Sequence, residues 1–337
     1  MSSRKSNIEL LRIIAMLMIV LLHANFYTLG FPCRDEILAA PFASFWRILA
    51  EQLCVAGVNI FILISGWFGI RPSLKGLCSL LYQVLFWGVV LVLCGLILDL
   101  DFSVKAIAKV FWFGSYYWFI IAYVGLYVLS PVINAYVEKA SSRQFLSVLV
   151  SFFAAEFIYG WAVSSESYNM GYSIVSFIGL YLLGRFLHLH SVKLKSLKVT
   201  VDIIFFLLLS IIPATVSWIG TKYGWPSFNP IYYSSPFVVG SAMFLFLAFT
   251  KKDFNNKVIN WIAASAFSVY LIHLHPVVEP WFRAAILDLA YRFSTFPFTC
   301  IVVPLSIVLL LVCTLSDKLR VGSWKMLCSL FFDKTDR

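Results

Sequence analysis

Apolar residues along this chain gather in ten stretches of membrane length, and short polar segments separate them. About 20 consecutive apolar residues are enough for a helix to cross the hydrocarbon layer of a bilayer. The stretches lie near residues 8–29, 47–70, 77–98, 115–134, 144–161, 171–188, 199–219, 231–250, 258–280 and 295–315. Short alternating strands, which are typical of a transmembrane barrel, are absent from the sequence. The pattern therefore predicts an all-α, polytopic membrane helix bundle with about ten transmembrane helices.

The composition agrees with this prediction. Hydrophobic residues make up 61% of the 337 positions and charged residues 12%, whereas soluble domains average roughly 45–50% and about 25%. The loops are short, and the sequence contains neither an internal repeat nor a low-complexity segment. We predict one membrane domain over residues 1–337, with its helices within about 8–315 and a cytoplasmic tail at 316–337.

Lysine and arginine are distributed unevenly between the two sets of loops. If the N-terminus lies inside, 18 of the 26 basic residues fall on the cytoplasmic side and seven on the other, with Arg12 inside the first helix. The positive-inside rule therefore places both termini in the cytoplasm. The same rule accounts for the basic balance, so we expect no nucleic-acid partner. The seven cysteines show no ligand spacing, and we expect no metal site.

Arg12 and His23 are the most informative residues, because both lie inside the first apolar stretch. Ionisable groups in hydrocarbon are costly and mark a functional site or a buried pair. Eleven positions at about 100° each end roughly 20° past three full turns, so the two side chains share one helix face about 16 Å apart. Such a face can hold a long anionic molecule end-on, with a cation near the cytoplasm and an imidazole past mid-membrane.

A second basic group follows the second apolar stretch. Ser65 and Gly66 allow close backbone approach in a helix bundle, and Arg71 and Lys75 come shortly after them. Together with Arg12, these cations can form a basic mouth for phosphates, which guanidinium groups bind through two hydrogen bonds. Taken alone, Arg71 and Lys75 also fit ordinary cytoplasmic anchors of a transmembrane helix.

Two further ionisable residues lie near the expected depth of His23. His273 ends the ninth stretch, and both a packing role and a site role are open for it. Its neighbour His275 is two positions away and points to a different helix face, so the pair does not bind a metal from one helix. Glu156 lies inside the fifth stretch, where a carboxylate needs a partner or a proton. It can orient an imidazole or bind an acceptor hydroxyl, or it can form a structural pair.

Five sequence elements occur in a characteristic order. They are Arg12-x10-His23; Phe61-x-x-x-Ser65-Gly66 followed by Arg71; Tyr117-Trp118-Phe119 with Leu126-Tyr127 and Pro131; the segment 179–185, GLYLLGR; and the segment 265–273, SAFSVYLIH. Over almost the whole length of the chain, these elements resemble the membrane acyltransferase-3 family of bacteria.

The resemblance implies a ten-helix enzyme of the bacterial inner membrane. It would transfer an acyl group, usually acetyl, from cytoplasmic acyl-coenzyme A to a hydroxyl of a cell-surface or periplasmic carbohydrate. Acyl-coenzyme A would be a substrate, with no permanently bound cofactor. The expected donor site comprises Arg12, Ser65, Gly66, Arg71 and Lys75, and the expected catalytic group is His23, with Glu156 and His273 as further candidates.

The imidazole of His23 can act in either of two ways in such a reaction. It can serve as the base for the acceptor hydroxyl, or as a nucleophile that carries the acyl group. Some members of the family carry a fused extracytoplasmic domain that completes the transfer. This chain ends at Arg337 soon after its last apolar stretch, so we expect it to act alone or with a separate transferase.

The alternative to an enzyme is a transport protein, namely a carrier or flippase for a polysaccharide precursor. Arg12 and His23 would then be substrate or proton sites. Transporters often show inverted repeats and paired broken helices, and the sequence shows neither. A structural membrane subunit is a third interpretation, for which an intramembrane arginine and histidine would be a poor choice. The resemblance therefore favours a membrane O-acyltransferase over these alternatives, with acetyl as the expected group.

Overall fold

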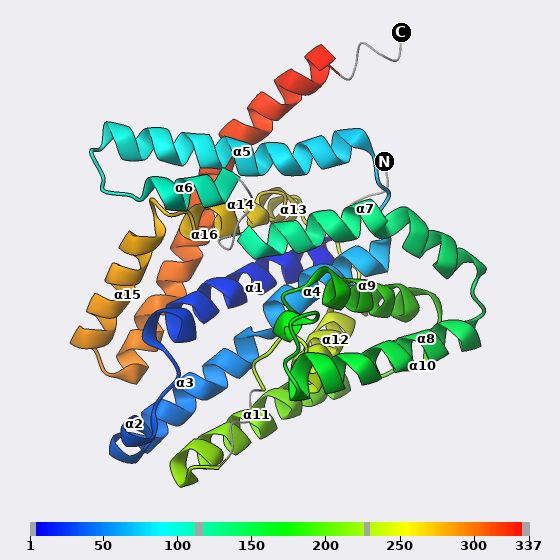
Figure 1. Ribbon diagram of the computed structural model, residues 1–337, viewed down its shortest axis with the longest axis horizontal. Helices are drawn as coiled ribbons and strands as arrows, with labels where there is room; N and C mark the ends of the chain where they lie inside the picture. Colours follow the sequence, from blue (N-terminus) through cyan, green and yellow to red (C-terminus); the bar gives the residue numbers. More distant parts are fainter. Residues whose placement is uncertain (1–4, 112–116, 226–229, 332–337) are drawn as a thin grey trace.

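The computed structural model describes residues 5–111, 117–225 and 230–331 as a bundle of helices, and no strand occurs within these ranges (Figure 1). The helices are, in chain order, α1 (Ser6–Leu22), η1 (His23–Tyr27), α2 (Arg34–Ala39), α3 (Pro41–Cys54), α4 (Ala56–Phe68), α5 (Leu74–Ile97), α6 (Val104–Phe111), α7 (Trp118–Lys139), α8 (Ser142–Ala155), η3 (Glu156–Ala162), η4 (Asn169–Gly171), α9 (Ile174–Leu189), α10 (Val192–Lys195), α11 (Val199–Tyr223), α12 (Pro236–Thr250), α13 (Lys257–Ala263), α14 (Ala266–His273), α15 (Glu279–Arg292) and α16 (Thr295–Phe331). The prediction of an all-α bundle is confirmed.

Seven helical segments in the described ranges are long and apolar enough to cross a membrane. They are Ser6–Tyr27, Pro41–Phe68, Leu74–Ile97, Trp118–Lys139, Ser142–Ala162, Val199–Tyr223 and Thr295–Leu330. Helices α9 and α12 are apolar but have only 16 and 15 residues. The polytopic membrane architecture follows from these segments, whereas the number of ten spans and the cytoplasmic termini stay predictions. In Figure 1, α1 begins right of the centre of the bundle, and α16 ends at the top of the view.

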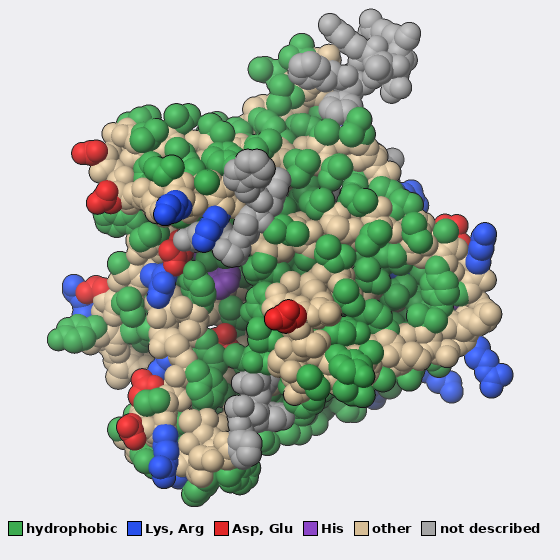
Figure 2. All heavy atoms as spheres, viewed as in Figure 1, with side chains coloured by type: hydrophobic (Ala, Val, Ile, Leu, Met, Phe, Trp, Pro, Cys, Tyr) green, Lys and Arg blue, Asp and Glu red, His purple; other side chains and the backbone are tan. Residues whose placement is uncertain are grey.

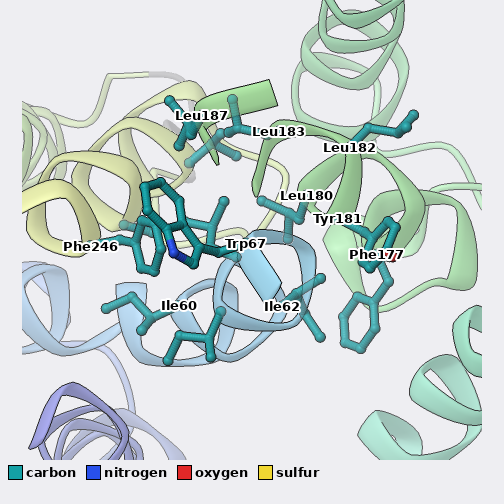
Figure 3. Close-up of a cluster of buried hydrophobic side chains, with 14 of the residues drawn as sticks. Ile60, Ile62, Trp67, Phe177, Leu180, Tyr181, Leu182, Leu183, Leu187 and Phe246 are labelled. Atoms are coloured by element: carbon teal, nitrogen blue, oxygen red, sulfur yellow. The ribbon is translucent and has the colours of Figure 1, made fainter. Parts of the chain in front are cut away.

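Helix α4 lies at the centre of the bundle, where it packs against α1, α9 and α12. Figure 3 shows Trp67 of α4 beside Phe246 of α12, and their ring centroids are 5.3 Å apart. On the other side, Gly66 of α4 faces Gly184 of α9, and a Cβ on either glycine would collide with a backbone carbonyl of the other helix. Small residues allow this close approach. Such packing matters in a membrane, because the hydrophobic effect does not drive helices together in lipid.

The single helix expected at 258–280 is wrong, because the chain breaks there into α13 and α14. A break leaves backbone carbonyls without their usual helical donors. Lys318 of α16 supplies donors at this point: its Nζ donates to the Trp261 carbonyl at 2.8 Å and to Ser265 Oγ at 2.9 Å. A side chain more than 50 positions away therefore satisfies polar groups at the interruption.

The last helix extends well past residue 315, where the sequence predicts a tail. Helix α16 continues to Phe331, and residues 332–337 of the expected tail lie outside the described ranges. Fully buried Asp317 accepts hydrogen bonds from Trp87 Nε1 of α5 at 2.9 Å and from Arg320 Nε at 2.7 Å. This buried ion pair attaches the added turns to α5, so the segment is part of the helical bundle.

Candidate active site

The first helix changes from α to π geometry at His23, the start of η1. Single π turns inside α-helices are rare and occur frequently at functional sites. Thr28 Oγ1 donates to the His23 carbonyl at 2.7 Å, and the Gly30 amide donates to the Phe26 carbonyl at 2.9 Å. The irregular backbone therefore begins at His23, and hydrogen bonds from Thr28 and Gly30 satisfy carbonyls at its two ends.

Helix α3 holds this turn through two side chains that are one helical turn apart. Buried Glu51, 3% exposed, accepts hydrogen bonds through Oε2 from Asn25 Nδ2 at 3.0 Å and from the Phe26 amide at 3.3 Å. Arg47 accepts from Asn25 Nδ2 at its carbonyl, 2.8 Å away, and donates through Nη2 to the Gly30 carbonyl at 2.6 Å. The π turn that carries His23 is thus fixed by a neighbouring helix.

His23 faces His273 across the bundle, with Nδ1 of His23 2.9 Å from Nε2 of His273. His273 is fully buried at the end of α14, and its Nδ1 lies 2.5 Å from the Val269 carbonyl. Tyr117 Oη donates to the Leu271 carbonyl at 2.6 Å, which satisfies a carbonyl near the same helix end. The Leu271 carbonyl therefore has a partner other than the two imidazoles.

The hydrogen-bond partners of the two imidazoles determine which nitrogen carries the proton in each ring when both are neutral. A carbonyl oxygen only accepts, so Nδ1 of His273 must carry the proton that it donates to Val269. Nε2 of His273 is then the acceptor, and Nδ1 of His23 is the donor to it. By this hydrogen-bond network, Nε2 of His23 holds a lone pair and can take up a proton or attack a carbonyl carbon.

Two adjoining cavities run along the face of α1 that carries Arg12 and His23. The larger has a volume of about 310 Å³ and is lined by Arg12 and Ser65, and the smaller, of about 30 Å³, is lined by His23. Both share the side chains of Phe61, Phe119 and Phe267. Three aromatic side chains therefore lie between a space beside a guanidinium and a space beside an imidazole.

Arg12 lines its cavity, whereas its ion-pair partner Glu9 does not. Its side chain is 34% exposed, and Nη1 lies 3.3 Å from Glu9 Oε1 one turn earlier on α1. Ser65 Oγ donates to the Phe61 carbonyl at 3.0 Å and lies 3.3 Å from Tyr123 Oη. Tyr123 and Gln83 line the same cavity, so one cation and several neutral polar groups face the space.

The structure places the other predicted site residues elsewhere. Gly66 lies in the contact between α4 and α9. Arg71 and Lys75 are exposed near the start of α5 and do not line either cavity. Glu156 is buried at the start of η3 and is likewise not part of the cavity linings, and its Oε2 has no hydrogen-bond partner. Arg12, Ser65, His23 and His273 are the predicted residues that the fold brings to one region.

Sequence reasoning missed Glu51, although a signal was present. A carboxylate five residues into the apolar stretch at 47–70 meets the same criterion that singled out Arg12 and His23. The three phenylalanines that line both cavities carry no such signal, because an aromatic residue in a membrane helix is ordinarily part of the packing.

The fold and these cavities define a multi-pass membrane protein in which one cavity is lined by a guanidinium and the adjoining one by an imidazole that contacts a second imidazole. The model of the acyltransferase-3 family, described as an acyltransferase domain, matches residues 5–315, and the chain belongs to this family. No curated protein and no solved structure matches the chain. The protein is thus a membrane acyltransferase, and the matched range includes every residue of the two cavities.

Proposed function

We propose that this acyltransferase moves an acetyl group from cytoplasmic acetyl-coenzyme A to a hydroxyl of a cell-surface or periplasmic glycan. The observation that carries the proposal is the pair of adjoining cavities, one beside Arg12 and the other beside His23. A donor that is anionic at one end and reactive at the other matches this order of groups. The coenzyme A phosphates would lie at Arg12, and the thioester would pass the three phenylalanines to His23.

The size of the second cavity supports acetyl as the transferred group. The space beside His23 has a volume of about 30 Å³ and is lined largely by apolar and aromatic side chains, including Trp118 and Tyr270. A short acyl group fits such a space, whereas a longer chain would have to displace packed aromatic rings, which costs free energy.

His23 supplies the proton acceptor in this proposal. The acceptor hydroxyl oxygen attacks the thioester carbonyl carbon while His23 Nε2 takes the hydroxyl proton. The carbon–sulfur bond then breaks, and the proton passes from His23 to the departing coenzyme A sulfur. Throughout, the Nδ1–H of His23 donates to His273, which holds the ring in the tautomer that the reaction requires and stabilises the imidazolium.

The cations near the start of α5 have a role outside the cavity in this proposal. Arg71 and Lys75 are exposed, and in this proposal they attract the phosphates of coenzyme A before the pantetheine arm enters. With both termini in the cytoplasm of a bacterial inner membrane, His23 faces the outer half of the bilayer. The acetylated glycan is released there, directly or through a separate extracytoplasmic transferase.

The test uses the purified protein in lipid nanodiscs with acetyl-coenzyme A labelled in its acetyl group. The acceptor is an envelope fraction from cells that lack the gene. The proposal expects release of free coenzyme A together with alkali-labile label in the envelope glycans. A protein that transports a labelled glycan precursor and releases no coenzyme A would be a carrier, and the proposal would be wrong.

A further inference from the structure

A cluster of three side chains lies next to His23 on the side away from Arg12. The Tyr27 ring contacts the His23 ring at a centroid distance of 5.3 Å, and Tyr27 is 45% exposed. Tyr27 Oη donates to Glu279 Oε1 at 3.1 Å, and Arg283 Nη1 lies 3.5 Å from the same oxygen. The guanidinium of Arg283 also lies over the Tyr27 ring, 5.5 Å from its centroid.

The cluster is tied to the second imidazole as well. Glu279 and Arg283 stand one turn apart on α15, and Phe282 between them packs against the His273 ring at a centroid distance of 5.6 Å. Helix α15 therefore contacts His273 directly through Phe282, and it is connected to His23 through Tyr27. A ligand held by Tyr27, Glu279 and Arg283 would have its near end beside His23.

The chemistry of the three groups suits a neutral, hydroxyl-rich molecule. Tyr27 is 45% exposed beside its contacts with Arg283 and His23, and the exposed part of an aromatic ring can pack against the C–H groups of a sugar. A carboxylate accepts hydrogen bonds from hydroxyls, and a guanidinium donates to their oxygens. Glu279 and Arg283 both belong to the cluster, so it carries no net charge. In the cavity beside Arg12, by contrast, the paired carboxylate of Glu9 is not part of the lining, so the cavity presents the cation.

The position of α15 agrees with an approach from the end opposite the donor. Figure 1 places α15 at the left of the bundle, while α1 begins at the right and runs from Arg12 toward His23 and Tyr27. Figure 2 shows a hollow on this face in which a histidine side chain is visible, with acidic and basic side chains to its left, on the side where Figure 1 places α15.

We propose that Tyr27, Glu279 and Arg283 form the acceptor subsite, which binds a neutral sugar of the glycan and presents one of its hydroxyls to Nε2 of His23. This inference rests on the proposed function, and it adds where the acceptor binds and what kind of sugar it is. Donor and acceptor then reach the histidine pair from opposite ends of the first helix.

The test compares Tyr27→Leu and Glu279→Gln with the parent enzyme in nanodiscs, with envelope fractions from the gene-deleted cells as acceptor and labelled acetyl-coenzyme A as donor. Arg292→Gln is the matched control, because Arg292 forms an ion pair with Asp288 at 2.8 Å on the same helix with the same spacing. Tyr27→Phe, which keeps the ring and loses only the hydroxyl, serves where the leucine variant does not fold.

The inference expects the acceptor concentration for half-maximal transfer to rise about tenfold or more in Tyr27→Leu and Glu279→Gln. Tyr27→Phe should give a smaller rise, the affinity for acetyl-coenzyme A should stay at the parental value in all three, and Arg292→Gln should match the parent. Parental acceptor dependence in both Tyr27→Leu and Glu279→Gln would overturn the inference alone. A parent enzyme that transfers no label would overturn the proposed function, and the inference would fall with it.

Discussion

His23 and His273 are 250 positions apart in the sequence, and their Nδ1 and Nε2 atoms lie 2.9 Å apart in the fold. The Val269 carbonyl accepts a hydrogen bond from the other nitrogen of His273. His23 therefore donates to His273, and His273 donates to this carbonyl. The consequence is a defined tautomer for His23, with its lone pair on Nε2. The predictions that follow concern this pair, its support and the path that leads to it.

His273→Leu should reduce acetyl transfer by about 10²-fold, because His23 loses the acceptor that selects its tautomer and stabilises its imidazolium. His273→Gln should retain more activity, since the Oε1 of glutamine can accept the same hydrogen bond. Transfer rates at saturating acetyl-coenzyme A check this order. Equal rates in the two variants would show that His273 acts by its volume alone.

Arg12→Gln should weaken acetyl-coenzyme A binding by about 10- to 100-fold, which corresponds to the loss of a charged hydrogen-bonding contact of about 1.5–3 kcal/mol. Arg71→Gln should weaken it less, because Arg71 is exposed and solvent screens its charge. Isothermal titration of the two variants gives both affinities. A larger loss in Arg71→Gln than in Arg12→Gln would contradict the placement of the phosphates at the cavity.

Glu51 gives a sharp test of how the π turn is held, because one carboxylate oxygen accepts both hydrogen bonds. Glu51→Gln can keep both through its single Oε1 and should transfer acetyl at a rate near that of the parent. Glu51→Leu leaves Asn25 and the Phe26 amide without this acceptor, so the turn should relax and the rate should fall about tenfold or more. Acetyl-coenzyme A affinity, which depends on the Arg12 cavity, should stay unchanged in both. A parental rate in Glu51→Leu would remove Glu51 from the positioning of His23.

The membrane topology has its own test. Ser167 and Asn255 are both exposed, and the charge distribution places them outside and inside respectively. Cys33, Cys94 and Cys300 are exposed natively, so the background for labelling carries serine at these positions. Ser167→Cys should then react with an impermeant maleimide in intact cells, and Asn255→Cys only after lysis. Labelling of both in intact cells would contradict the predicted orientation.

Hydrophobic length and buried charge were enough to predict the helical membrane bundle and to single out Arg12 and His23. Both signals are local, because a run of apolar residues or an intramembrane cation is visible without any partner. The break at Ser265 and the extension of α16 depend instead on Lys318 and Asp317, which act through contacts between distant helices. Such contacts leave no periodic pattern in the sequence.

The candidate site likewise combines features that the sequence predicts with contacts that only the fold reveals. Arg12, Ser65, His23 and His273 lie together as the spacing and depth of these residues suggested, with the histidine contact itself visible only in the fold. Gly66 was expected near the donor, but it lies in a helix contact, because a small residue serves close packing as readily as ligand approach. The support from Glu51 and Arg47 became apparent only once α3 was placed against the π turn.

The rate of acetyl transfer by His23→Asn tests the central claim most directly. Asparagine is polar and smaller than histidine, so it leaves the cavity beside Arg12 intact and removes the basic nitrogen. The account predicts a loss of about 10²- to 10⁴-fold in the transfer rate, the usual contribution of a general base, with acetyl-coenzyme A still bound at the parental affinity. A transfer rate within a few-fold of the parent would contradict the assignment of His23 as the proton acceptor.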